Sequence, residues 1–272
     1  MIELICNQKQ TLKEFTDNTC AQASFVWTYL LKNKEVKVNG KKTGENVLLS
    51  EGDRVQYYLT KKQEEKPAFY VVYEDENLLI VDKESGVNSE AVFAELGRKE
   101  GGMYAFIHRL DRNTRGLLTF GKTEKAEKEL LLAFKEKRVE KKYHALCFGC
   151  FEKKKAVLTA YLEKDERNSL VKIYDKAKTG AETIITEYET LEENDGVSKV
   201  EVTLHTGKTH QIRAHLAHIG CPIVGDMKYG NKLKNREHLA ARQSLVAKKL
   251  SFRFEGELSY LNGKTFLSRF EV

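Results

Sequence analysis

The 272-residue sequence contains no hydrophobic run that approaches the length of a membrane-spanning helix. Its first residues also lack the charged-then-apolar pattern of a secretory signal, so we expect a cytoplasmic protein. The cysteines form no framework of the kind that small secreted proteins use; they are Cys6, Cys20, Cys147, Cys150 and Cys221. These absences argue against a membrane protein and against a disulfide-stabilised secreted domain.

Metal and cofactor motifs are equally scarce. Cys147 and Cys150 form a Cys-x-x-Cys pair, but it lies in an apolar run without a second pair, which favours two strand thiols over a zinc site. Four histidines crowd into residues 205–218, yet no acidic residue stands at the spacing of His-Glu-x-x-His. We therefore expect neither a metal nor a cofactor, and interpret these imidazoles as substrate contacts or buried hydrogen-bonding groups.

Composition indicates a folded chain of more than one unit. Charged residues make up 32% and hydrophobic residues 41% of the sequence, which is typical of a globular protein. The length allows one large domain and a small one. A net charge of +6 permits a polyanionic partner without requiring one.

Residues 11–58 have a pattern of their own. Apolar residues at helical spacing predict two short helices, and Val36–Lys41 and Gly52–Tyr57 predict strands beside tight turns. Lysines gather around the first turn, and Lys37, Lys41 and Lys42 are candidates for phosphate contacts. A solvated surface hairpin is the alternative interpretation.

The motifs Val-Lys-Val-Asn-Gly and Gly-Asp-Arg-Val make this region similar to the S4 RNA-binding domain. The resemblance implies an RNA-binding domain over residues 1–62. The charged stretch 63–68, which includes Pro67, then reads as a linker to a second domain over residues 69–272.

In the second domain, strand-like runs outnumber helical ones and do not alternate with them regularly. We expect strands at Val71–Tyr73, Leu78–Val81, Tyr143–Phe148, Ala156–Leu162, Ile184–Leu191 and Val200–Leu204, and helices at Ala91–Lys99, Thr123–Arg138 and Gln211–His218. This order favours an α+β fold over a doubly wound sheet.

The segment His108–Lys122 is the most informative part of the chain. It sets Asp111 among Arg109, Arg112 and Arg115. Nearby positive charge favours an ionised carboxylate, which is suited to attack an electrophilic carbon or to accept a proton. The arginines suit an anionic substrate such as RNA, although a surface loop with ion pairs would look the same.

The same segment contains the spacing of a phosphate-binding loop, from Gly116 to Thr123. Such loops use small residues between their glycines, whereas this one has Leu-Leu-Thr-Phe, which favours a buried strand. The candidate magnesium-binding strand, Leu78–Asp82, also precedes the loop instead of following it. We therefore predict a strand here and not a nucleotide site.

Two further stretches complete a pattern: Lys142-Tyr143-His144-Ala145, and Thr206–His215 with Pro222–Asp226 after it. With His-Arg-Leu-Asp at the front, the three resemble the RluA-type RNA pseudouridine synthases. That resemblance implies a mixed, mainly antiparallel sheet and a cofactor-free reaction. The bond from ribose C1′ to uracil N1 breaks, the base turns, and C1′ joins C5.

The resemblance also implies roles for individual residues. Asp111 would be the catalytic carboxylate, either attacking C1′ or taking the 2′ proton. Tyr143 would stack on the uracil and could serve as the base at C5, and Arg213 would pair with Asp111. The RNA-binding residues expected around them are His108, Arg109, Arg112, Arg115, Lys142, Lys208, His210 and Gln211, in addition to Lys37, Lys41 and Lys42.

Some positions depart from the family pattern. Lys83-Glu84-Ser85-Gly86 lacks the usual proline, Arg115 replaces a serine, and Lys208 replaces an arginine. We hypothesise that Arg115 adds a phosphate contact beside the carboxylate. The expected substrate is large-subunit ribosomal RNA, with transfer RNA left open, acted on by a monomer. A catalytically silent RNA-binding protein is the alternative.

Overall fold

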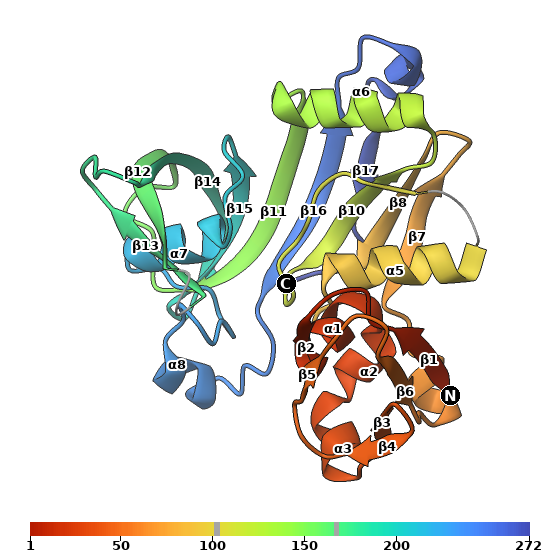
Figure 1. Ribbon diagram of the computed structural model, residues 1–272. Helices are drawn as coiled ribbons and strands as arrows, with labels where there is room; N and C mark the ends of the chain where they lie inside the picture. The colour runs from red at the N-terminus through yellow and green to blue at the C-terminus, as the bar shows by residue number, and fades with distance from the viewer. Residues whose placement is uncertain (101–103, 166–168) are drawn as a thin grey trace.

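The computed structural model describes residues 1–100, 104–165 and 169–272. One large sheet dominates it, with strand order β13-β12-β14-β15-β11-β16-β10-β8-β7 (Figure 1). These strands are β7 Phe69–Glu74, β8 Leu78–Lys83, β10 Arg115–Gly121, β11 Val139–Phe148, β12 Lys155–Asp165, β13 Leu170–Tyr174, β14 Glu182–Asn194, β15 Val197–Leu204 and β16 Leu245–Phe252. Short strands β9 (Ala105–Phe106) and β17 (Thr265–Leu267) pair with β10 and β16.

Among the strand pairs of the described residues, one pair in the interior of this sheet is parallel. β10 and β16 run parallel, whereas the other named pairs are antiparallel. The prediction of an α+β fold with a mixed sheet is confirmed. Gly116 lies in the parallel contact with a φ of +115°, and an added Cβ would lie 2.3 Å from the Ala247 carbonyl oxygen. The segment with the spacing of a phosphate-binding loop thus forms strand β10, as predicted. Its first glycine allows the close approach of two strands.

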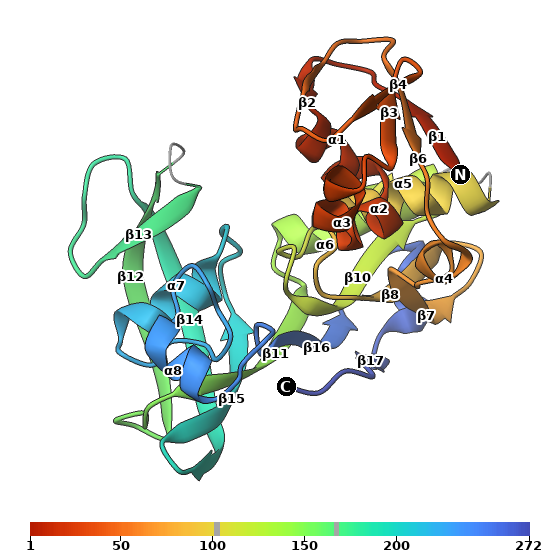
Figure 2. The same cartoon turned by 90° about the horizontal axis from the view of Figure 1, so that it is seen from below.

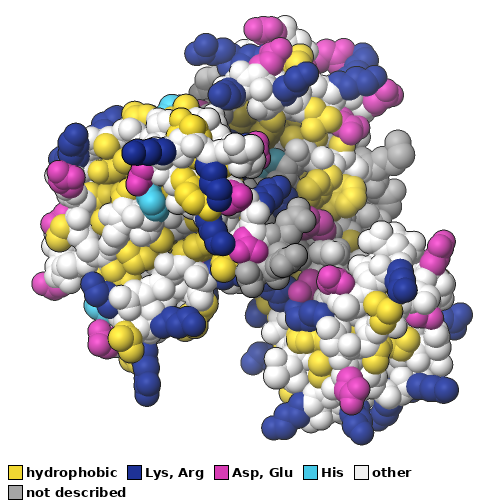
Figure 3. Space-filling model, turned by 60° about the vertical axis from the view of Figure 1, so that its left-hand side comes forward, with side chains coloured by type: hydrophobic (Ala, Val, Ile, Leu, Met, Phe, Trp, Pro, Cys, Tyr) yellow, Lys and Arg dark blue, Asp and Glu magenta, His cyan; other side chains and the backbone are white. Residues whose placement is uncertain are grey.

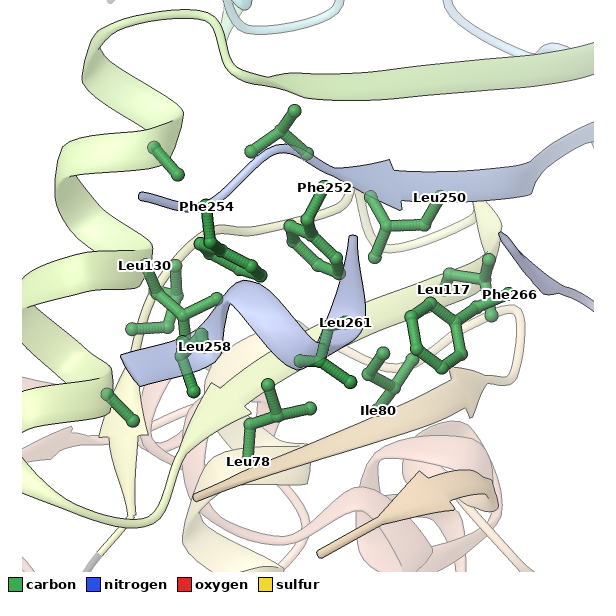
Figure 4. Packing of buried hydrophobic residues seen from close by; sticks show 14 residues of the cluster. Leu78, Ile80, Leu117, Leu130, Leu250, Phe252, Phe254, Leu258, Leu261 and Phe266 are labelled. Carbon is green, nitrogen blue, oxygen red and sulfur yellow. The ribbon is translucent and has the colours of Figure 1, made fainter. Parts of the chain in front are cut away.

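Helices cover both faces of the right-hand part of the sheet. On one face, α6 (Glu124–Lys135) and the 3₁₀ helix η1 (Glu257–Leu261) pack over Leu78, Ile80 and Leu117 (Figure 4). On the other face, α5 (Ser89–Glu100) packs over alternate residues of the same strands, including Leu79 and Leu118. Strands β8 and β10 are buried on both faces, which explains their continuous hydrophobic runs. In the left-hand part, α7 (Gln211–His218) packs against β13 and β14.

The first sixty residues form a small unit with its own core. It comprises β1 Ile2–Ile5, β2 Gln10–Thr11, α1 Leu12–Thr19, α2 Ala21–Phe25, α3 Trp27–Lys32, β3 Val36–Val38, β4 Lys41–Thr43, β5 Leu48–Leu49 and β6 Arg54–Tyr57. Three short helices stand where the sequence pattern predicted two, and the predicted strands are present as β3 and β6. The strands β1, β2 and β5 were not expected. The stretch expected as a linker begins inside a short helix, α4 (Lys61–Glu64), which Thr60 and Gln63 cap reciprocally.

This N-terminal unit packs on α5 (Figure 2). The Gln22 side-chain amide donates to Glu95 at 2.9 Å, and the Asn88 amide donates to Asn18 at 2.9 Å. Asn88 directly precedes α5, so the contact with the N-terminal unit reaches the end of α5 nearest the His108–Lys122 segment.

The end of the chain is fastened beside the start of β10. Arg115 Nη2 donates to the Glu271 carbonyl at 2.6 Å, and its guanidinium lies 5.0 Å from the Phe270 ring centroid. Lys248 Nζ donates to the Ser268 carbonyl at 2.7 Å and to the Phe270 carbonyl at 3.0 Å. The Arg115 guanidinium thus contacts this C-terminal segment in the folded chain, and its expected contact with RNA phosphate stays a hypothesis.

We expect Arg115→Ser to loosen residues 268–272, because it removes one charged hydrogen bond and one cation–π contact. The loss should be about 1–3 kcal/mol in the local opening equilibrium. Faster trimming by a carboxypeptidase, followed by mass spectrometry, would measure it. Arg109→Ser is the matched control and should trim at the wild-type rate. A weaker affinity for RNA with an unchanged trimming rate would support the hypothesis of a phosphate contact instead.

Candidate active site

Asp111, Arg213 and Asp226 form a chain of ion pairs at the centre of the molecule. Arg213, on α7, donates from Nη1 to Asp111 Oδ2 at 2.9 Å. Its Nε and Nη2 donate to the two carboxylate oxygens of Asp226, at 2.7 and 3.1 Å. Asp226 is completely buried and Arg213 is 5% exposed. The predicted pairing of Arg213 with Asp111 is present in the structure.

Asp226 is a site residue that residue-by-residue reasoning missed, although it ends the Pro-Ile-Val-Gly-Asp stretch noted above. Burial acts to raise its pKa, but hydrogen bonds from Arg213 and from the backbone amides of Tyr229 and Lys228 outweigh burial and lower it. In turn, Asp226 and Asp111 overcome the burial of Arg213 and raise the pKa of its guanidinium. The buried charges are therefore matched by their neighbours.

Asp111 opens into a cavity of about 670 Å³. Tyr143 lines the same cavity from β11 and is 8% exposed. Burial, reinforced by the Asp111 charge, raises the pKa of the Tyr143 phenol well above its usual value, so it stays protonated at neutral pH. Ile212 and Leu245 add apolar lining. A carboxylate beside an aromatic ring in such a cavity suits a planar, polar base.

His210 stands beside Asp111, immediately before α7. Its backbone has a φ of 54°, and its ring lies with Nε2 4.0 Å from Asp111 Oδ2. Nδ1 lies 2.8 Å from the Tyr229 hydroxyl, which itself accepts a hydrogen bond from the Val171 amide. Burial lowers the pKa of His210, so the ring is neutral at pH 7. A Tyr229 hydroxyl that donates to Nδ1 leaves the imidazole proton on Nε2, facing the carboxylate.

The three arginines around Asp111 in the sequence have other partners. Arg109 pairs with Glu90 at 3.0 Å at the surface. Arg112 pairs with Asp17 at 2.6 Å and donates to the Ser24 hydroxyl at 2.8 Å, so it joins the N-terminal unit to the loop that carries Asp111. A tertiary ion pair holds the Arg112 guanidinium, and the expected RNA contact of this residue stays a prediction.

Of the two neighbouring lysines of β11, Lys141 lines the cavity and Lys142 does not. Alternate residues of a strand share a face, which places Lys141 with Tyr143. Lys141 lines the cavity, and its ammonium lies 5.3 Å from the Phe134 ring centroid. Lys142 instead pairs with Glu201 of β15 at 2.5 Å. Lys142 is not among the residues that line this cavity, and its expected RNA contact stays a prediction.

Three other predicted RNA contacts have structural partners. His108 stacks on Phe134, accepts a hydrogen bond from the Thr119 amide at 3.1 Å, and has its pKa lowered to about 3 by burial. Gln211 is buried and bonds to four neighbours: Thr206, Lys208, Ile185 and Thr186. The Lys208 ammonium pairs with Glu182. The side chain of Gln211 thus holds the loop before α7 in place, and its expected RNA contact stays a prediction.

The remaining candidates lie apart from this site or have separate partners. Lys41 and Lys42 are exposed on β4, and the Lys37 ammonium lies 4.9 Å from the Tyr58 ring centroid. His205, His215 and His218 bond to Glu187, Thr186 and Asp175 respectively. Within the described ranges, no three His, Cys, Asp or Glu side chains form a group that could hold a metal ion. No described helix is long and apolar enough to cross a membrane.

Comparison with known proteins identifies the family. A family model for RNA pseudouridylate synthases matches residues 30–218. The chain belongs to this family. It is 33% identical over 231 residues to ribosomal large subunit pseudouridine synthase C of Rickettsia felis, covering 74% of this chain and 75% of that protein. The enzyme of the same name from Vibrio cholerae is 33% identical over 230 residues, with 75% and 71% covered.

A solved structure agrees with this assignment. Human RNA pseudouridylate synthase domain containing 1 has a TM-score of 0.61 and 29% identity, covering 69% of this chain and 79% of that one. This RNA pseudouridine synthase is therefore an isomerase of uridine in RNA.

Asp226→Asn tests the buried ion pair of this synthase. It leaves Arg213 short of one negative charge in a buried site, so we expect a loss of about 3–5 kcal/mol in the free energy of unfolding at pH 7. Urea denaturation of wild type and variant would measure it.

The same pair predicts a pH dependence. Because the folded-state pKa of Asp226 is lowered, its stabilisation is fully present above the unfolded pKa and is lost as pH falls through the folded value. The stability gap between wild type and Asp226→Asn should therefore begin to narrow below about pH 4, near the ordinary Asp value, and narrow further as pH falls towards the folded value. A gap that is constant from pH 7 to pH 3 would contradict the role of the charge. Asp175→Asn, at an exposed ion pair, is the control.

Proposed function

We propose that this enzyme converts specific uridines of large-subunit ribosomal RNA to pseudouridine, with Asp111 as the catalytic carboxylate. The observation that carries the proposal is the Arg213–Asp111 hydrogen bond at the mouth of the cavity lined by Tyr143. Curated relatives at 33% identity carry the name of a ribosomal large subunit enzyme, which supports this RNA as the substrate.

The geometry supports a separate role in the reaction for Arg213, Asp111 and Tyr143. Arg213 holds one carboxylate oxygen of Asp111, which fixes the side chain and leaves the other oxygen to meet the ribose. Asp111 then attacks C1′ or takes the 2′ proton as the C1′–N1 bond breaks. The freed uracil turns against the Tyr143 ring and C5 bonds to C1′. In the first route the bond from C1′ to Asp111 breaks at this step, and in the second Asp111 returns the proton to C2′. C5 then gives up its proton while N1 gains one. The protonated phenol of Tyr143 favours stacking over a role as the base in the resting site.

We further propose that residues 1–62 are an S4-like RNA-binding domain and residues 69–272 the catalytic domain. The helix pair and the lysine-bearing hairpin β3–β4 support this division. Figure 3 shows Lys and Arg side chains spread around the exposed surface of the N-terminal unit. The N-terminal unit packs against α5, so we propose that it binds RNA as a module docked on the catalytic domain and not as a freely tethered one.

Tritium release from [5-³H]uridine-labelled large-subunit RNA tests the catalytic assignment. Asp111→Ala should lower the release rate by at least 10³-fold, because it removes the group that reacts at the ribose. Asp175→Ala, at an exposed carboxylate, should match wild type. Release by Asp111→Ala at more than a tenth of the wild-type rate would contradict the proposal. Transfer RNA as the labelled substrate tests the other RNA class, and preferential turnover of it would reassign the substrate.

Combined Lys37→Gln, Lys41→Gln and Lys42→Gln substitutions test the N-terminal domain. Removing three phosphate-contacting charges should weaken binding to the RNA and flatten its salt dependence. Filter binding across a salt series would measure both. The control is Lys61→Gln with Lys62→Gln on α4. Equal affinities for the two multiple variants would contradict an RNA-binding hairpin.

A further inference from the structure

A second, larger hollow lies beside the cavity that holds Asp111. Its volume is about 860 Å³. It is formed by the end of α6, the turn into β11, the end of β15 with the loop after it, and the end of β16. Phe134, Lys141, Leu204 and Gly207 line both hollows, so the two share a wall at Lys141. A strand of nucleic acid leaving the first hollow would pass this residue.

Among the Lys and Arg side chains around the two hollows, those without a carboxylate partner in the described part of the chain line the second hollow. Close to Asp111, the side chains of Arg109, Arg112 and Lys208 are paired with carboxylates. By contrast, four cations of the second hollow form no salt bridge with a carboxylate anywhere in the described ranges; they are Lys135, Lys137, Lys141 and Arg253. Unpaired positive charge is thus concentrated where no acidic side chain neutralises it.

The acidic residues that line the second hollow do not cancel its positive charge. Glu136 pairs with Arg138 at 2.8 Å, and Glu187 is shared by Lys155 and His205. Glu140 lies 4.0 Å from Lys142 and 3.9 Å from Lys249. Each of these carboxylates already has a cation beside it. The remaining surface therefore attracts an anion of extended shape.

The four cations have complementary positions. Lys135, Lys137 and Arg253 are exposed at the rim, where a flexible polyanion could reach them. Lys141 is partly buried at the junction, close to Gly207, where an added Cβ would lie 3.6 Å from its Nζ. A glycine at that point leaves room beside the ammonium. Burial without a counter-charge lowers the pKa of Lys141, and a bound phosphate would supply the missing charge.

We propose that the second hollow binds the phosphodiester backbone of the RNA strand adjoining the target uridine, with Lys141 on the phosphate at the junction. The inference rests on the proposed function, because it takes RNA as the substrate. It extends that function by assigning a flanking-strand subsite to four cations that lie outside the three sequence motifs.

The salt dependence of RNA binding tests this subsite. In an Asp111→Ala background that prevents turnover, the triple variant Lys135→Gln, Lys137→Gln and Arg253→Gln should lose about 2 from the slope of log Kd against log salt, at about 0.7 per single-strand phosphate. Lys141→Gln alone should lose about 0.7. The controls are Lys142→Gln, which is in the same hollow but paired with Glu201, and Lys128→Gln, which is on α6 and paired with Glu124. Both should keep the parent slope, and all variants should keep its melting temperature.

Substrates shortened on one side of the target locate the strand. One substrate is trimmed 5′ of the uridine and another is trimmed 3′ of it. The difference in salt slope between the triple variant and the parent should disappear with one of these two substrates and persist with the other. A parent-like slope in the triple variant, or a difference that survives both trimmings, would overturn the subsite. The proposed function fails separately, through absence of tritium release by the wild-type enzyme with any RNA.

Discussion

The buried guanidinium of Arg213 is the interaction on which the geometry of this molecule depends. A charge that is 5% exposed is tolerated only with matched partners, and Arg213 has a bidentate carboxylate on one side and Asp111 on the other. The three residues come from three separate segments: α7, the loop after it, and the loop before β10. The hydrogen bonds among these three residues can therefore form only when the three segments are held in one fixed relative position.

The loop that bears Asp111 is held at each end by groups that leave it little freedom. On one side, Ser89 Oγ both donates to the Leu110 carbonyl and accepts from the Leu110 amide. On the other, the Arg112 carbonyl accepts from the Gly86 amide at 2.9 Å and from Lys83 Nζ at 3.2 Å. Lys83 also binds the Val87 carbonyl, and burial lowers its pKa to about 7. This network supports the turn where the family's usual proline is missing.

Local pattern predicted most of the secondary structure because local physics decides it. The apolar stripe of α6, the alternation in β14 and the continuous apolar runs of β8 and β10 each follow from periodicity and burial. Asp111, Tyr143 and Arg213 were found through motif resemblance, and the structure brings them together. The S4 resemblance and the individual residue roles remain predictions.

The contacts that the sequence did not reveal are those with partners distant in sequence. Nothing local to Arg112 indicates Asp17 on α1, and nothing local to Arg115 indicates the Glu271 carbonyl. An arginine beside a catalytic carboxylate looks the same in sequence whether RNA or protein occupies it. That Lys141 and not Lys142 lines the cavity has a different cause, since a one-residue shift along a strand reverses the face of the sheet. Strand alternation counted from Tyr143 would have given Lys141.

The partners of the three neighbouring arginines explain how Asp111 can stay reactive in a basic segment. A free guanidinium within reach would bind both carboxylate oxygens and compete with the substrate. Here Arg109, Arg112 and Arg115 are each occupied elsewhere, and Arg213 divides its donors so that only Nη1 reaches Asp111. Asp111 Oδ2 is thereby fixed, whereas Oδ1 accepts no hydrogen bond from the described part of the chain. The ion pairs around the loop thus supply its rigidity and leave one oxygen available for the ribose.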